Sequence, residues 1–338
     1  MDNSRLNRSL LPLKAGESLM PWLWIGTWSM GGLGWGRVDG SESVLTIREA
    51  FSSGVRHFDT AGFYGKGESE RIIKKALGRH RKEIFISSKA GLLWKGNRVI
   101  HDARPETIEK ELEKSLERLG TDYIDLFQLH WPDPDVPVSE SIDALKRLEK
   151  KGLARNWGAG NLTAEEIKHF IDNHAQVPIQ TRFNPLYRKS ASVLAAGHEH
   201  QRAVNCIISP LEQGLLGTGK GRHGSANLGK KDHRQRNPLF SDKTAIKNAT
   251  KFRKLCDKQG CSPVTATLLW ILSYKHADII IPGPKNRRQL KETLEHTNLL
   301  TRHNVTHAST SGFKVACRQL LLGLAGYDIA ALLDNADR

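Results

Sequence analysis

The chain has 338 residues, of which 38% are apolar and 26% are charged, and its formal net charge is +15 at pH 7. This composition excludes a disordered chain, and the longest apolar runs, at 266–272 and 320–325, are too short to span a bilayer. The basic surplus favours anionic partners, which include phosphorylated cofactors, acidic substrates and nucleic acid.

The N-terminal segment and the cysteines point to a cytoplasmic protein. Residues 1–20 include basic side chains, but Lys14 and Glu17 interrupt any apolar run, so no signal peptide is predicted. The four cysteines, at positions 206, 256, 261 and 317, lack the paired spacing of a metal site. Reduced thiols are the simpler interpretation.

From residue 23 onward, short apolar runs alternate with segments whose apolar residues recur at helical spacing. Strands are predicted, in chain order, over 23–28, 55–59, 83–89, 123–129, 154–159, 178–183, 204–209 and 278–281. Helices are predicted over 41–51, 68–77, 104–119, 138–150, 163–173, 190–200, 244–258, 263–274 and 286–295. Ser41 is the expected N-cap of the first helix, Gly120 ends the third, and Thr163 with Glu166 forms a capping box.

This alternation predicts the fold class. Eight strands that each precede a helix favour a (β/α)8 TIM barrel in a single domain. A Rossmann sheet is disfavoured, because no G-x-G-x-x-G follows an early strand. We expect an N-terminal lead-in or hairpin over 1–20, the barrel over 21–296, and an atypical C-terminal tail over 297–338 with a helix-like piece at 313–324.

Four polar residues follow predicted strands: Asp59, Tyr64, Lys89 and His130. The C-terminal ends of barrel strands meet at one mouth, so residues distant in sequence can meet there. An ammonium near a phenol lowers the pKa of the phenol, and a carboxylate keeps the ammonium charged. A histidine can orient a carbonyl oxygen or assist proton transfer. The set can protonate an oxygen as hydride reaches the adjacent carbon, although each residue alone also fits a structural role.

Four segments, in order, resemble the motifs of the aldo-keto reductase family: GVRHFDTAGFYGKGESE, FISSKAG, YIDLFQLHWPD and WGAGN. The resemblance covers about residues 10–295. It implies an NADP-dependent reductase that converts an aldehyde or ketone to an alcohol. It further implies that Tyr64 is the general acid, that Asp59 and Lys89 tune it, and that His130 orients the substrate carbonyl.

The resemblance also implies a cofactor site for NADPH or NADP+ across the barrel mouth. The implied contacts are Gly26, Thr27 and Trp28 at the first strand end, Asn161 and Gln180 on the carboxamide, Ser209, Leu211 and Gln213 along the pyrophosphate, Lys285 and Asn286 on the 2′-phosphate, and Gln289 beside the adenine. The basic segment 220–236 is either a solvated loop or a lid over a phosphate.

Three positions depart from the family pattern. Ile208 stands where many relatives carry an aromatic residue that stacks under the nicotinamide, so stacking is lost or supplied by another side chain. Thr293 replaces a usual asparagine near the end of the adenine motif. Residues 158–160 are Gly-Ala-Gly, where relatives commonly carry Gly-Val-Ser.

The expected partner is a small-molecule carbonyl substrate, for which Phe63, Trp94 and Trp131 are candidate pocket residues. No nucleic-acid partner is expected, because aromatic residues do not interleave the basic ones, and no membrane partner or metal site is expected either. A cofactor-binding regulatory protein, like the potassium-channel β subunits that share the fold, is the alternative. A metal-dependent hydrolase is disfavoured, because no cluster of histidines and acids follows the strands. Oligomeric state has no signal in the sequence.

Overall fold

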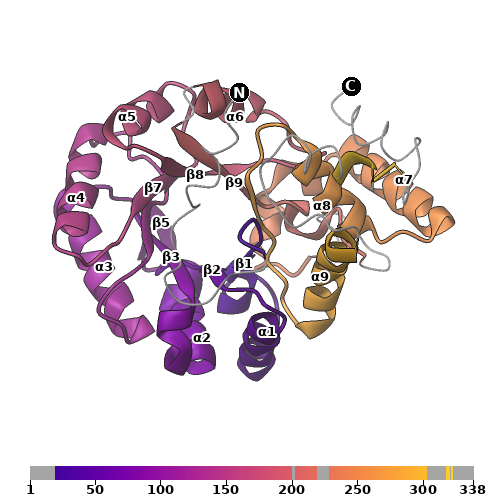
Figure 1. Cartoon of the computed structure of the whole chain (residues 1–338), viewed down its shortest axis with the longest axis horizontal. Coiled ribbons are helices and arrows are strands. Elements are labelled where there is room, and N and C mark those ends of the chain that lie inside the picture. Colours follow the sequence, from indigo (N-terminus) through magenta and orange to yellow (C-terminus); the bar gives the residue numbers. More distant parts are fainter. Residues whose placement is uncertain (1–19, 200–201, 219–227, 303–316, 320, 323–338) are drawn as a thin grey trace.

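The computed structural model describes residues 20–199, 202–218, 228–302, 317–319 and 321–322. Eight parallel strands form one sheet in the order β1-β2-β3-β6-β7-β8-β9-β10. The last strand returns to the first, because the amide of Ile280 donates to the carbonyl of Trp22 at 2.8 Å and that of Gly26 to Pro282 at 2.9 Å. Figure 1 shows the helices outside this ring of strands. The predicted (β/α)8 barrel is confirmed.

Each predicted strand and helix overlaps an element of the structure. The barrel strands are β1 (Trp24–Gly26), β2 (His57–Asp59), β3 (Phe85–Ala90), β6 (Leu126–Leu129), β7 (Trp157–Gly160), β8 (Val177–Arg182), β9 (Ala203–Ile208) and β10 (Ile279–Ile281). The helices are α1 (Gly40–Ser52), α2 (Glu68–Leu77), α3 (Pro105–Leu119), α4 (Val138–Lys150), α5 (Glu166–Asn173), α6 (Ala191–Glu199), α7 (Lys243–Gln259), α8 (Pro263–Ser273) and α9 (Arg287–Arg302). An antiparallel hairpin, β4 (Leu92–Lys95) with β5 (Arg98–His101), was not predicted.

The helix ends show which capping predictions hold. The N-cap of α1 is Asp39, whose carboxylate accepts from the amide of Ser41 at 2.8 Å, so the assignment of Ser41 as the cap was wrong. Asp is the stronger cap there because its carboxylate also suits the positive end of the helix dipole. The capping box before α5 is confirmed, since Thr163 and Glu166 exchange backbone-to-side-chain hydrogen bonds of 2.7 and 3.2 Å.

The domain boundaries stay proposals. Helix α9 runs to Arg302 and therefore passes through the proposed boundary between 296 and 297. The lead-in before residue 20 and most of the helix-like piece at 313–324 lie outside the described residues. Across the ranges that are described, no helix combines the length and the apolarity needed to cross a bilayer.

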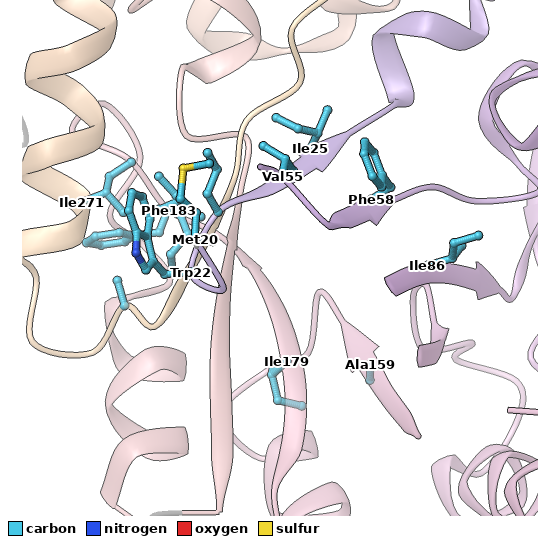
Figure 2. Close-up of a cluster of buried hydrophobic side chains, with 14 of the residues drawn as sticks. Met20, Trp22, Ile25, Val55, Phe58, Ile86, Ala159, Ile179, Phe183 and Ile271 are labelled. Carbon is cyan, nitrogen blue, oxygen red and sulfur yellow. The ribbon is translucent and has the colours of Figure 1, made fainter. Parts of the chain in front are cut away.

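Successive residues of a strand point to opposite faces, and this alternation separates two cores. Outward residues such as Ile25, Phe58 and Ile179 belong to the large cluster between the strands and the helices, part of which is drawn in Figure 2. Trp24 and Phe85 belong to a separate cluster inside the barrel. The next inward position on β2 after the apolar layer is Asp59, so the barrel interior becomes charged toward its mouth.

His57 lies in the interior layer at the base of the barrel. Its ring stacks on Trp24 with centroids 5.4 Å apart, contacts Phe85 at 5.2 Å, and is 1% exposed. Burial lowers the pKa of His57 to about 3, because an imidazolium there would have no solvation. Within the described part of the chain, its Nδ1 atom has no hydrogen-bond partner.

We expect His57 to make the protein less stable in mild acid. The folded-state pKa lies below the unfolded value of about 6.5, so protons favour the unfolded chain and stability falls as pH drops from about 6.5 toward 3. The loss at pH 5 is about 2 kcal/mol. Urea unfolding at pH 7 and pH 5 should show that wild type loses about 2 kcal/mol more between these pH values than His57→Phe, which keeps a ring beside Trp24. An equal loss in both proteins contradicts the assignment.

Candidate active site

The loop that carries Tyr64 rests directly on the loop after β1. Gly65 has φ of 59°, and a Cβ atom on it would overlap the carbonyl oxygen of Gly31. A Cβ on Gly31 would in turn lie 2.9 Å from the amide nitrogen of Gly65. The two backbones approach this closely because neither residue has a side chain. Ser69 adds a hydrogen bond of 2.9 Å to the carbonyl of Thr27, which fixes the start of α2 against the same loop.

A buried ion pair lies below Tyr64. The Nζ atom of Lys89 donates to both carboxylate oxygens of Asp59, at 2.7 and 2.9 Å, and to the carbonyl of Thr60 at 2.7 Å. The carboxylate also accepts from Ser87 at 3.0 Å and from Gln180 at 2.5 Å. Asp59 and Lys89 are 3% and 2% exposed. Charges buried this deeply need such a complete set of partners.

The rings of Tyr64 and His130 complete the group. The Lys89 ammonium lies 5.1 Å from the centroid of the Tyr64 ring. The His130 ring stands edge-on to the tyrosine with centroids 5.6 Å apart, and Trp28 stacks on the tyrosine at 5.9 Å. The structure therefore brings together all four residues that the sequence selected from three strand ends.

The electrostatics differ from the sequence expectation in one respect. The pKa of Tyr64 lies well above its usual value, because the phenol is buried and because the Asp59 carboxylate opposes a phenolate. The expectation that Lys89 lowers the pKa of Tyr64 below its usual value was therefore wrong. Burial lowers the pKa of Lys89, and the Asp59 charge opposes this. Burial and then the Lys89 charge hold the pKa of His130 well below its usual value. Tyr64 is therefore a protonated phenol and His130 a neutral imidazole at neutral pH.

A cavity of about 910 Å³ opens above this group. The predicted cofactor contacts that line it are Gly26, Trp28, Asn161, Ser209, Leu211, Gln213, Lys285 and Gln289. Three others have different surroundings. Thr27 donates to the carbonyl of Asp59 at 3.0 Å, Gln180 donates to the Asp59 carboxylate, and Asn286 caps α9 by accepting from the amide of Gln289 at 3.0 Å.

Several cavity residues were not selected from the sequence. Arg234 and Arg288 line the cavity beside Lys285. The only sequence signal for Arg234 was its place in the basic segment 220–236, of which residues 220–227 lie outside the described ranges. Of the three aromatic residues that the sequence did select for the substrate pocket, Phe63 and Trp131 line the cavity, and Phe63 stacks on Trp94 with ring centroids 4.9 Å apart.

Residues 23–306 match the family model of the Aldo/keto reductase family, which spans the whole barrel. The chain belongs to the aldo/keto reductase family. It is 33% identical over 280 residues to the aldo-keto reductase YhdN of Bacillus subtilis strain 168, a match that covers 81% of this chain and 84% of that protein. It is 30% identical over 308 residues to an NADH-specific methylglyoxal reductase of Escherichia coli strain K12, with 86% and 93% covered.

A solved structure agrees with this membership. The glycerol dehydrogenase AKR11B4 from Gluconobacter oxydans matches with a TM-score of 0.71 and 29% sequence identity, covering 90% of this chain and 92% of that one. As an aldo-keto reductase, the chain is an oxidoreductase that acts on carbonyl compounds. The family typically uses a nicotinamide cofactor.

The residues of this aldo-keto reductase fit such a cofactor chemically. The side-chain amide of Asn161 lines the cavity next to His130 and donates to the backbone carbonyl of His130 at 2.9 Å. Lys285 and Arg234 also line the cavity. Burial lowers the pKa of Lys285, and the nearby charge of Arg234 lowers it further. Two cations held near each other suit a phosphate group.

Proposed function

We propose that this chain reduces an aldehyde or ketone to an alcohol with NADPH, and that Tyr64 donates the proton. One observation carries the proposal. The phenol of Tyr64 and the imidazole of His130 line the same cavity as Lys285, directly above the buried pair of Asp59 and Lys89. A proton donor, an orienting group and a phosphate-binding cation thus share one cavity, and the substrate is a small carbonyl compound.

When bound, the reduced nicotinamide supplies the hydride. Neutral His130 can donate a hydrogen bond to the substrate carbonyl oxygen and so orient it. Tyr64 then gives its proton to the oxygen, because an alkoxide is a stronger base than a phenolate. The Lys89 ammonium stabilises the resulting phenolate, and Asp59 holds that ammonium charged and in place.

The charge around Lys285 supports a preference for NADPH. Its ammonium donates to the carbonyl of Trp35 at 2.8 Å, and no carboxylate contacts it among the described residues. Arg234 and Arg288, by contrast, are paired with Asp232 and Glu292 at 2.7 Å. A 2′-phosphate would therefore find its counter-charge on Lys285. Because the methylglyoxal reductase of Escherichia coli is NADH-specific, the preference of this chain between NADPH and NADH needs a direct measurement.

We expect Lys285→Met to weaken NADPH binding about 10- to 100-fold, because it removes a charged hydrogen bond to the 2′-phosphate. NADH binding should change less than about twofold. Fluorescence titration with both dinucleotides measures this, with Lys291→Met as the control, since Lys291 is an exposed lysine on α9, the helix that begins just after Lys285. Equal weakening of NADPH and NADH contradicts the role of Lys285, and tighter wild-type binding of NADH overturns the preference.

The activity itself is tested by NADPH oxidation with a panel of aldehydes and ketones. Turnover supports the reductase. Tight NADPH binding without turnover on any carbonyl compound would favour the alternative, a cofactor-binding regulatory protein. Binding of neither dinucleotide would refute the cofactor site. The cytoplasmic location stays a prediction from the sequence.

A further inference from the structure

Glu212 is a buried carboxylate that joins three segments around the cavity. It follows β9 and has 0% exposure. Its Oε1 atom accepts from Nη2 of Arg182 at 2.5 Å and from Nδ2 of Asn237 at 2.6 Å. Its Oε2 atom accepts from Nε of Arg182 at 3.2 Å and from Nδ2 of Asn184 at 2.7 Å. All four hydrogen bonds come from segments distant in sequence.

The turn at residues 209–214, which contains Glu212, has an unusual backbone. Ser209, Glu212 and Gln213 have φ values of 51°, 46° and 53°, a left-handed conformation that residues with a Cβ adopt rarely. Such residues persist only where the surroundings hold them. Asn184 contributes directly, since the same amide group that binds Glu212 also donates to the carbonyl of Ser209 at 3.0 Å.

The third segment, residues 228–240, is attached to the same turn. Asn237 donates to the side-chain oxygen of Gln213 at 3.3 Å as well as to Glu212. His233 ties the segment to the loop after β1 through two hydrogen bonds to the carbonyl of Gly34, at 3.0 Å from its amide and 2.7 Å from its Nδ1 atom. The cavity is thus bordered by a turn with a left-handed backbone and by a segment that is hydrogen-bonded to Glu212 through Asn237.

We propose that Glu212 is a positioning residue that holds the 209–214 turn, and through Asn237 the 228–240 segment, in the conformation that receives the cofactor pyrophosphate. This inference rests on the proposed function. Ser209, Leu211 and Gln213 line the cavity from this turn, whereas Glu212 is not among the lining residues and is hydrogen-bonded to Arg182, which is. The competing interpretation is that Glu212 contributes only to fold stability, as buried ion pairs elsewhere do.

The test compares Glu212→Gln with Asp125→Asn. Asp125 is also a buried carboxylate with arginine partners, Arg81 at 2.7 Å and Arg155 at 3.3 Å, but it precedes β6 at the opposite end of the barrel. Isothermal titration should show that Glu212→Gln raises the Kd for NADPH about tenfold, or about 1.4 kcal/mol. Asp125→Asn should leave that Kd unchanged even if it lowers the melting temperature.

A fragment of the cofactor distinguishes an effect on the 209–214 turn from an effect on the adenine end of the site. Adenosine 2′-phosphate lacks the pyrophosphate, so its Kd should be the same in wild type and in Glu212→Gln. KM for NADPH should rise more than kcat falls. If Glu212→Gln does not fold, Asn237→Ala removes one donor and should raise the NADPH Kd about threefold.

An unchanged NADPH Kd in a folded Glu212→Gln or Asn237→Ala overturns the inference and leaves the proposed function intact. Equal weakening of NADPH and of adenosine 2′-phosphate also overturns it, because the effect would then not be confined to the turn. Failure of wild type to bind NADPH or NADH refutes the proposed function instead, and the inference with it.

Discussion

Replacing Tyr64 with phenylalanine is expected to lower kcat for aldehyde reduction about 10²- to 10⁴-fold, the usual contribution of a positioned proton donor. The ring is retained, so its contacts with Trp28 and His130 remain and the loop keeps its shape. NADPH affinity should change less than about twofold, because the phenol hydroxyl is not among the groups assigned to the cofactor phosphates. Stopped-flow reduction of a single aldehyde at saturating NADPH measures the effect.

Tyr187→Phe is the matched control, because Tyr187 lines the same cavity and packs under the guanidinium of Arg182 at 3.9 Å. Removal of that hydroxyl should leave kcat within about twofold of wild type. If both variants lost activity to the same extent, the general polarity of the cavity would explain the loss. If Tyr64→Phe kept full kcat, Tyr64 would not be the proton donor.

The barrel was predictable because its signals are local and repeated. Helices α2 and α4 begin and end where the sequence predicts, since each combines an apolar face with clear end signals. The sequence of the β4–β5 hairpin also contains a turn signal, but it was overlooked because it lies within the repeating strand-helix pattern. Gly96 and Asn97 stand between two strand-like runs, and Gly96 has φ of 63°, as a tight hairpin turn requires.

The candidate site was predictable only in part. Asp59 ends β2, Lys89 lies near the end of β3 and His130 follows β6, so the barrel topology alone brings these three residues to one mouth. The direction of the Tyr64 pKa was not predictable, because desolvation depends on burial, which the sequence does not report. Glu212 was missed for a similar reason, since its partners are 25 to 30 residues away in the chain.

Lys89→Met is expected to have two effects: it should remove most of the activity, and it should destabilise the fold. It leaves the Asp59 carboxylate buried with only neutral partners, Ser87 and Gln180, and loss of one member of a buried pair costs about 3–5 kcal/mol. It also removes the charge that stabilises the Tyr64 phenolate, which we expect to lower kcat about 10²-fold or more. Urea unfolding and single-turnover reduction measure the two effects separately.

The double variant Asp59→Asn with Lys89→Met distinguishes stability from catalysis. With both charges removed, no unpaired ion remains in the barrel, so most of the lost unfolding free energy should return. The low kcat should persist, because Tyr64 still lacks its ammonium. Lys114→Met, which breaks the half-exposed pair with Glu111 at 2.9 Å, should cost at most about 1 kcal/mol and leave kcat unchanged. Recovery of kcat along with stability in the double variant would reduce Lys89 to a structural residue.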